Sequence, residues 1–339
     1  MPPGAGARRD RDAPGKRTGI DAVRSVPFLL VHLTPLLLIV TGVSWRAAVL
    51  FAMTLWGRLF CITAGYHRYF AHRSYKLARF PQFVLAFAGT TAAQKGPLWW
   101  AGHHRVHHRF ADTPRDLHSP TQGFWWSHVG WILSDRYAAT DLDSIRDFAR
   151  YRELRFLDRH DWIGPWLLAF VCFAVAGWKG LVLGFFCSTV VLWHTTFLIN
   201  SLAHVMGRRT YETDDTSRNS VVLAVLTLGE GWHNNHHYWP SSARQGFRWW
   251  QWDPTYYGLQ VLSWLGLVRE LRRVPTWARA RNHADRSTGR DRSRPDRRGP
   301  GRPTVAIAAG GVAGDAVLER GPADAGEGSA PRDRYRASG

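Results

Sequence analysis

The chain contains few sulfur-bearing residues, with three cysteines and three methionines among 339 residues. Cys61, Cys172 and Cys187 each lie in an apolar stretch, and none belongs to a Cys-x-x-Cys pair. The sequence therefore predicts neither a disulfide framework nor a thiolate metal site. It also lacks the Gly-x-Gly-x-x-Gly motif of flavin- and nicotinamide-binding domains.

Acidic residues are also scarce, because 26 Asp and Glu oppose 44 Lys and Arg and leave a net charge of +18. A basic balance of this size suits anionic lipid headgroups or phosphorylated small molecules. No zinc-finger spacing or recognition-helix pattern supports nucleic acid as a partner. The chain lacks the two Glu-x-x-His motifs of helical-bundle carboxylate metal proteins, so we expect any metal to be bound by nitrogen atoms alone.

Histidine, in contrast, is abundant and clustered. The three clusters are His67 with His72, His103–His108, and His233–His237. Two of them repeat the spacing i, i+3, i+4, which places three rings on one face of a helix; these triplets are His104, His107, His108 and His233, His236, His237. Neutral imidazole suits iron, copper, nickel and zinc. The clusters therefore predict a shared site for more than one metal ion.

Four apolar segments accompany these clusters and form two pairs. Val26–Val43 precedes Ala47–Ala64, and Ile163–Trp178 precedes Leu181–Leu202. A membrane-spanning helix needs about 20 mainly apolar residues, so three segments suffice and Ile163–Trp178 is short. Because the links within each pair are short, we expect an all-α integral membrane protein with four transmembrane helices in two hairpins. A cytoplasmic helical domain would then carry the histidine-bound metals.

Charge indicates the orientation of these helices. Both tails and the loop Gly65–Trp162 are rich in Arg and Lys, whereas the hairpin tips carry only Arg46 and Lys179. The positive-inside rule predicts a multi-pass protein of the cell (inner) membrane with both termini and the loop in the cytoplasm. All histidine clusters then lie on the same side, where they can meet.

The remaining segments complete the predicted organisation. Phe83–Ala93 is apolar but too short to span a membrane, and Pro254–Val268 has the pattern of an amphipathic helix. We expect residues 1–25 to be a disordered basic tail, residues 26–275 to form one membrane domain, and residues 276–339 to be a disordered tail rich in Arg, Gly, Pro and Ala.

Nine histidines are candidate metal ligands, too many for one ion but suited to two transition metals with four or five ligands each. They are His67, His72, His104, His107, His108, His204, His233, His236 and His237. His204 joins them because Asn200 and His204 lie at i and i+4. A metal-sequestering tract would instead be polar and of low complexity. We expect His32 and His194 to be packed residues and His103 to lie off the ligand face. For His118, His128 and His160 the sequence leaves two roles open, contact with substrate and packing.

These residues resemble the histidine boxes of the membrane-bound fatty acid desaturases, in particular the bacterial acyl-CoA delta-9 (stearoyl-CoA type) branch. The resemblance covers about residues 26–275 and is carried by Gly65–Arg73, Trp99–Arg109, Ser127–Trp131, Asn200–His204 and Gly229–His237. It implies two ferrous ions held by the nine histidines, Asn200 reaching one metal through a water, and O2 as co-substrate. The reaction implied is desaturation of a saturated long-chain acyl group to a cis-monounsaturated one, with acyl-CoA and acyl-lipid both open as the substrate. Departures at Pro114, Leu117 and Ser220 put headgroup contacts in doubt, but not the metal site.

The resemblance also implies a tunnel for the acyl chain and a source of electrons. Wall candidates are Trp99, Trp100, Trp131, Trp193 and Trp232, each equally well explained as a core or interfacial aromatic. Lys95, Arg105 and Arg109 are candidates to bind coenzyme A phosphates, or else lipid phosphates. The sequence shows neither a cytochrome b5-like module nor a dinucleotide-binding module. We therefore expect the electrons to come from a separate ferredoxin-like protein or NAD(P)H reductase. The alternatives are a fatty acyl hydroxylase or alkane monooxygenase with related histidine boxes, and a metal transporter, which would need ionisable residues along its spans.

Overall fold

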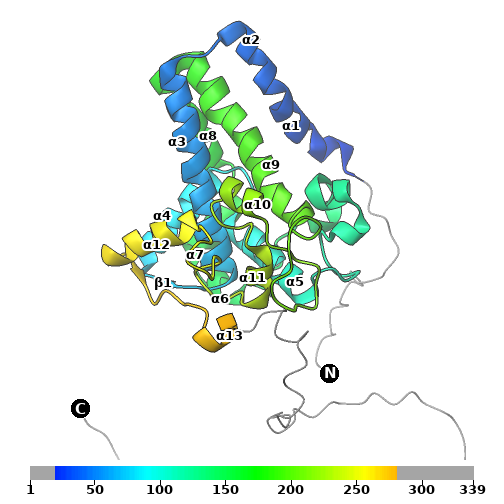
Figure 1. Ribbon diagram of the computed structural model, residues 1–339. Helices are drawn as coiled ribbons and strands as arrows, with labels where there is room; N and C mark the ends of the chain where they lie inside the picture. Colours follow the sequence, from blue (N-terminus) through cyan, green and yellow to red (C-terminus); the bar gives the residue numbers. More distant parts are fainter. Residues whose placement is uncertain (1–19, 281–339) are drawn as a thin grey trace, which may run out of the picture. The chain divides into compact units, whose positions relative to one another are not determined.

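A computed structural model describes residues 20–280, so the predictions for residues 1–19 and 281–339 lie outside the described residues. The described chain is mostly helical, as predicted (Figure 1). Sheet structure within it is limited to isolated bridges and one antiparallel pair, β1 (Lys76–Leu77) and β2 (Val268–Arg269).

The first two apolar segments form two helical runs separated by a tight reversal. The first run consists of α1 (Ala22–Leu33), η1 (Thr34–Leu37) and α2 (Leu38–Thr41), and the second of α3 (Trp45–Phe60) and η2 (Cys61–Ala71). Gly42 lies between them with a φ of 66°, a left-handed conformation that glycine adopts without steric cost. Ser44 then caps α3, because its side-chain oxygen accepts a hydrogen bond from the Ala47 N–H. The reversal at Gly42 lies just before the gap that the sequence predicts between the segments Val26–Val43 and Ala47–Ala64.

The second pair of apolar segments also folds back on itself. It comprises α8 (Ile163–Lys179), η6 (Gly180–Cys187) and α9 (Ser188–Ser201). The backbone leaves helical geometry at Ala176 and at Gly177, whose φ is 60°. The turn therefore precedes the predicted break at Lys179-Gly180, because Gly177 is the residue that tolerates positive φ. Helix α3 packs against both η6 and α9, and Figure 1 shows α3, α8 and α9 side by side.

Two helical segments, Trp45–Ala71 and Ile163–Ser201, are long and apolar enough to cross a membrane, judged by length and composition. Ser25–Thr41 is a shorter apolar helix. Many large apolar side chains on these segments are exposed, including Ile39, Val40 and Phe170. Exposed apolar surface of this extent marks a membrane or protein contact.

The other helices form the part of the protein drawn below these segments in Figure 1. They are α4 (Arg79–Thr90), α5 (Pro97–Phe110), η3 (Pro120–Gln122), η4 (Trp126–Gly130), η5 (Asp135–Tyr137), α6 (Arg146–Ala149), α7 (Arg152–Arg159), α10 (Val221–Leu226), α11 (His233–Tyr238), α12 (Pro254–Trp264) and α13 (Thr276–Ala280). The predicted amphipathic helix ends at Trp264 rather than Val268, since the chain then forms β2. Helix α13 falls in the segment expected to be disordered; Ala278 is buried, and Trp277 packs edge-on against Trp239.

Candidate metal centre

The first histidine pair depends on a widened helix. η2, which continues α3, is π-helical, so its N–H groups bond to carbonyls five residues earlier. The His72 N–H donates in this way to the His67 carbonyl at 3.1 Å. Residues five apart thereby approach one face, which a helix of about 3.6 residues per turn would not allow. The two imidazole rings have centroids 4.8 Å apart.

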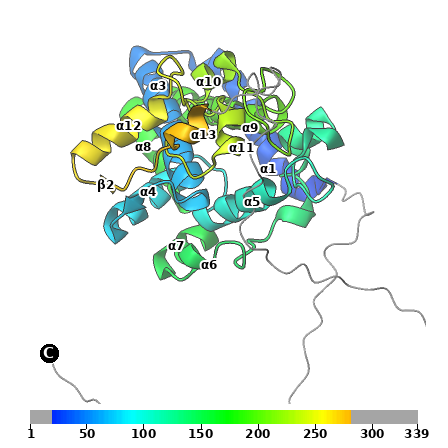
Figure 2. The same cartoon turned by 60° about the horizontal axis from the view of Figure 1, so that its bottom comes forward.

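The two histidine triplets lie on helices, as their spacing predicts. α5 carries the first triplet and α11 the second, and the two helices lie side by side in both views (Figures 1 and 2). The N-terminus of α5 is capped by Asp158, whose Oδ1 accepts hydrogen bonds from the N–H groups of Leu98 and Trp99. His204 differs from the prediction, because α9 ends at Ser201 and the face shared with Asn200 is interrupted there.

All nine candidate histidines gather into two adjoining groups whose ring nitrogens lie within 4.8 Å of one another in each group. Site A consists of His67, His72, His104, His108 and His236. Site B consists of His107, His204, His233 and His237. The groups touch where the His108 and His237 rings stack with centroids 4.3 Å apart.

Within these groups the Nε2 atoms converge. The Nε2–Nε2 distances are 3.0 Å for His67–His236, 3.0 Å for His72–His104, 2.9 Å for His108–His236 and 3.1 Å for His204–His233. Two nitrogens that bind one ion at roughly 2.1 Å and at right angles lie about 3 Å apart, so the spacing suits a shared metal. The His237 Nε2 is buried with no hydrogen-bond partner, which suits a nitrogen reserved for a ligand. Imidazole is a preferred ligand of iron, so the residues fit two iron ions.

Burial keeps most of these rings neutral. Burial first, and neighbouring histidines second, lower the pKa values of His72, His104, His108, His233 and His236 well below the ordinary value. Burial also lowers the pKa of His237, to about 4. His107 differs from these six: burial lowers its pKa, but Asp116 and other carboxylates outweigh burial and raise it. Neutral rings offer the lone pairs that a metal needs, whereas at low pH a metal must displace a proton from His107.

Four carboxylates hold the Nδ1 atoms of ligand candidates, and the sequence analysis missed all four. The contacts are His67–Glu230 at 2.5 Å, His107–Asp116 at 2.9 Å, His204–Asp112 at 3.0 Å and His237–Asp215 at 2.7 Å. An Nδ1–H that donates to a carboxylate fixes the ring and leaves Nε2 free for a metal. The available signal was that Asp112, Asp116 and Glu230 lie within a few residues of the histidine clusters.

A cavity of about 470 Å³ reaches site A. We call it the central cavity; His104 and Asn200 form part of its wall, and most other lining residues are apolar or aromatic. Trp100 stacks on His104 with ring centroids 5.0 Å apart, and its Nε1 donates to Gln94 Oε1 at 3.3 Å. The cavity therefore has the chemistry to hold an apolar chain beside the histidines.

Comparisons with known proteins identify the family. Residues 43–267, more than half of the chain, match the family described as fatty acid desaturase. The chain belongs to this family. It is 38% identical over 262 residues to a probable chloroplastic lipid desaturase of Arabidopsis thaliana, covering 76% of this chain and 72% of the relative. An sn-1 stearoyl-lipid 9-desaturase of Synechocystis sp. is 36% identical over 256 residues, covering 75% and 80%. An acyl-CoA 5-desaturase of Anemone leveillei is 38% identical over 238 residues, covering 69% and 74%.

The desaturase is therefore an oxidoreductase of lipid metabolism that desaturates fatty acyl chains, and its histidine groups fit a di-iron mechanism. Its central cavity is lined by four of the predicted wall residues, Trp99, Trp100, Trp131 and Trp193. Trp232 does not line this cavity. It is buried, and its Nε1 donates to the Trp252 carbonyl at 2.7 Å.

The two arginines proposed to bind substrate also lie outside the lining of the desaturase cavity. Arg105 is occupied within the protein, since Nη1 binds Asp147 Oδ1 at 2.8 Å and Nη2 donates to the Phe70 carbonyl at 2.7 Å. Arg109 is exposed on α5. Trp232 and Arg105 therefore make contacts within the protein, and their contact with substrate stays a prediction.

Other histidines of the desaturase lie outside sites A and B. His103 Nδ1 bonds to the Trp99 carbonyl at 2.7 Å, and His118 stacks on His107 with centroids 4.3 Å apart. His128, His194 and His32 form a chain of ring contacts, at 3.0 Å between the first two and 2.9 Å between the last two. His160 packs near Phe156. None of them belongs to either histidine group.

The carboxylate behind His237 provides a direct test of site B. Replacing Asp215 by asparagine is expected to weaken Fe2+ binding there by roughly 10- to 100-fold, because the ring loses the anion that orients it and makes it more basic. Chelator competition on purified protein at pH 7 measures this change. Asp143→Asn is the control, since that carboxylate is exposed and pairs only with Arg146 in the described structure; equal iron affinity in the two variants would contradict the role of Asp215.

Proposed function

We propose that sites A and B each hold one ferrous ion, and that the nine histidines are the protein ligands. Asn200 is proposed to reach one of the two ions through a water. The observation that carries this proposal is the convergence of buried, mostly neutral imidazoles at Nε2–Nε2 distances of 2.9–3.1 Å. When bound, the iron pair supplies the activation of O2, which no side chain of the protein can provide.

The protein's own residues position the chain and protect the site. The central cavity is proposed to hold a long-chain acyl group so that its ninth carbon–carbon bond lies beside His104 and Asn200. Trp100, held by Gln94, forms a rigid part of the wall at this point. Two hydrogens leave adjacent carbons, two electrons and two protons come from a donor, and one O2 becomes two waters. The product is a cis double bond.

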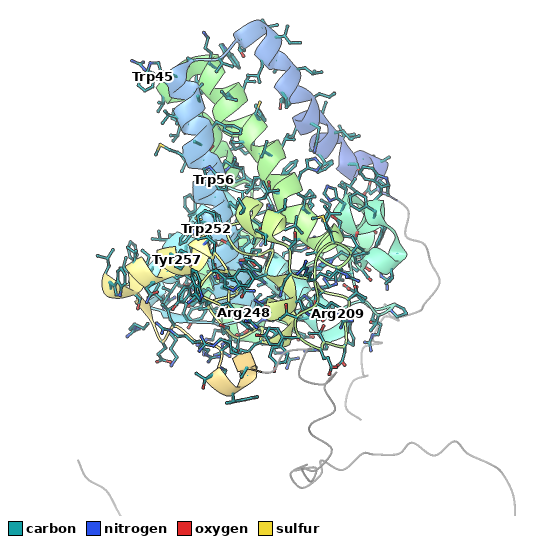
Figure 3. All side chains as sticks on the ribbon, in the orientation of Figure 1. Trp45, Trp56, Arg209, Arg248, Trp252 and Tyr257 are labelled. Atoms are coloured by element: carbon teal, nitrogen blue, oxygen red, sulfur yellow. The ribbon has the colours of Figure 1, made fainter. Side chains whose placement is uncertain are left out.

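The proposal extends to topology and partners. Four membrane spans, with both termini and the metal centre in the cytoplasm, are supported by the exposed apolar helices and by the position of the basic residues. Figure 3 places Trp45 at one end of the structure and Arg209 and Arg248 at the other. Aromatic residues at the ends of spans and cations on the inner side are the expected pattern of an inner-membrane protein. Electrons are proposed to come from a separate ferredoxin-like protein or reductase.

The test is complementation of an unsaturated-fatty-acid auxotroph, followed by mass spectrometry of double-bond position. Growth with a cis bond at carbon 9 is the expected result. A hydroxylated chain would indicate the related hydroxylase activity instead. A double bond at another carbon would contradict the proposal that the ninth carbon–carbon bond lies beside His104 and Asn200. The parallel variant with His104 replaced by alanine is expected not to support growth.

A further inference from the structure

Helix α12 packs against η2, and Figure 1 shows it crossing the end of α3 that continues into η2. Gly258 of α12 approaches α3 so closely that a Cβ on it would lie 2.6 Å from Phe60 Cε2. The Thr255 and Thr63 hydroxyls form a hydrogen bond at 2.8 Å, which joins the start of α12 to η2. The position of α12 is therefore fixed relative to the helix that carries the first histidine pair.

The face of α12 that points away from the protein is apolar and exposed. Tyr257, Val261, Trp264 and Leu265 are the exposed residues, and they have the spacing i, i+4, i+7, i+8 of one helix face. Trp264 is 76% exposed. Residues 254–268 include no charged side chain. A helix without charge and with an exposed apolar face of this length requires a partner that covers it.

The exposed apolar surface continues onto two neighbouring segments. Its further residues are Val221, Val222 and Val225 on α10 and Trp249, Trp250 and Trp252 in the loop before α12. The Thr255 N–H donates to the Leu228 carbonyl at 3.1 Å, so the segment after α10 adjoins the start of α12. We call α10, the three tryptophans and the outer face of α12 the apolar platform.

The position and residue types of the apolar platform favour a lipid leaflet as its partner. Figure 3 shows Trp252 and Tyr257 next after Trp56 in the direction of the spans, and Arg248 farther from the spans than these aromatic residues. Tryptophan and tyrosine are enriched at the boundary between hydrocarbon and headgroups. Arg248 precedes α12 in the chain and Arg269 follows it, and both are exposed. Cations at the surface of a membrane attract anionic headgroups.

The carboxylates next to α12 have other partners. Asp253 is buried and pairs with Arg68 at 2.9 Å, and Glu270 pairs with Lys76 at 2.7 Å. The surface therefore combines an apolar helix face with flanking arginines. This combination is typical of helices that lie in the plane of an anionic membrane surface.

We propose that the apolar platform lies in the plane of the cytoplasmic leaflet, with the outer face of α12 among the upper acyl carbons and with Arg248 and Arg269 bound to the phosphates of anionic phospholipids. The inference rests on the topology proposed above, but not on the proposed reaction. Because α12 is joined to η2, this contact also fixes the distance between the membrane surface and the first histidine pair.

The test measures which quenchers reach a fluorophore attached at one of three positions. The full-length, iron-loaded protein is reconstituted in vesicles of phosphatidylcholine and phosphatidylglycerol, with its native cysteines replaced by alanine and one new cysteine as the attachment site. Trp264→Cys labels the platform. Trp277→Cys is the matched control, because Trp277 is 59% exposed on α13, which Figure 1 draws at the end away from the spans. Val40→Cys labels the exposed side of a proposed span.

Lipid brominated on its acyl chains and aqueous iodide are the two quenchers. Lipid quenching at residue 264 is expected to be roughly threefold or more stronger than at residue 277, with the opposite order for iodide. Equal lipid quenching at the two positions overturns the proposal. Protection of residue 264 from both quenchers also overturns it, because a second copy of the chain or another protein would then cover α12. Absence of lipid quenching at residue 40 overturns the proposed topology itself.

The same label tests the charge of the lipid. Brominated phosphatidylglycerol is expected to quench the fluorophore at residue 264 roughly twofold or more strongly than brominated phosphatidylcholine at the same mole fraction, because cations enrich anionic lipid around them. Replacing Arg248 and Arg269 together by glutamine is expected to abolish this preference. Arg146→Gln is the control that keeps it, since Arg146 is exposed on α6 and pairs with Asp143. Equal quenching by the two lipids in the unsubstituted platform, or an unchanged preference in the double variant, overturns the assignment of an anionic lipid as the partner.

Discussion

Replacing His237 by alanine is expected to empty site B of iron and to reduce desaturation by more than about 100-fold. Loss of a carboxylate behind a ligand costs roughly 10- to 100-fold, so loss of the ligand itself must cost more. Site B has only four histidines, and His237 supplies a buried Nε2 that has no other partner. The substitution also leaves Asp215 without the ring to which it binds at 2.7 Å. Iron per protein and product formed with a reconstituted donor are the measurements.

His103→Ala is the matched control for iron content. His103 precedes His104 on the same helix, but its ring packs on Trp99 with centroids 4.4 Å apart and lies outside both groups. The control is expected to keep two iron ions per protein. Alanine at each of the other eight histidines is expected to remove iron from the site to which that histidine belongs, with a similar loss of desaturation. Two bound iron ions and normal turnover in the His237 or His204 variant would falsify the assignment of nine ligands.

Much of the fold and the grouping of the histidines follow from periodic patterns. The triplets on α5 and α11 were predictable because positions i, i+3 and i+4 share a helix face whatever the tertiary structure. The two reversals were predictable to within a few residues, since apolar runs of this length end where Gly and polar residues occur. Iron binding by these groups and the four-span topology stay predictions.

The parts that escaped prediction depend on contacts between distant segments. The π-helical widening of η2 has no sequence pattern, because its hydrogen bonds are selected by packing rather than by residue type. Asp215 contacts His237 across a loop whose path no local pattern specifies. Arg105 has the appearance of a phosphate-binding residue in the sequence, yet Asp147, 42 positions away, occupies its guanidinium.

The second large effect is expected at Arg68. This residue follows His67 in the sequence and is not itself a candidate metal ligand. Its side chain is fully buried and pairs with Glu230 and Asp253, each at 2.9 Å, while Nη1 donates to the Ala243 carbonyl at 2.7 Å. Glu230 holds His67, and Asp253 caps α12 by accepting from the Tyr256 N–H at 3.0 Å. Burial raises the pKa of Glu230, but His67 and Arg68 outweigh burial and lower it to about 2. The guanidinium therefore joins the ligand helix, the turn before α11 and the start of α12 through two carboxylates.

Arg68→Met is expected to destabilise the protein by roughly 3–5 kcal/mol, because removing one partner of a buried ion pair leaves uncompensated charge. Arg79→Met is the matched control: Arg79 pairs with Glu153 at 2.7 Å at the surface, where its side chain is 69% exposed and solvent screens the pair. Thermal unfolding of iron-free protein in detergent is expected to shift by more than about 5 °C in the first variant and much less in the second. Adding Glu230→Gln to Arg68→Met should cost less than the two single effects combined, since the second change removes a charge that the first left unpaired. A shift no larger than that of Arg79→Met, or strict additivity with Glu230→Gln, would show that Arg68 does not hold the first histidine cluster in place.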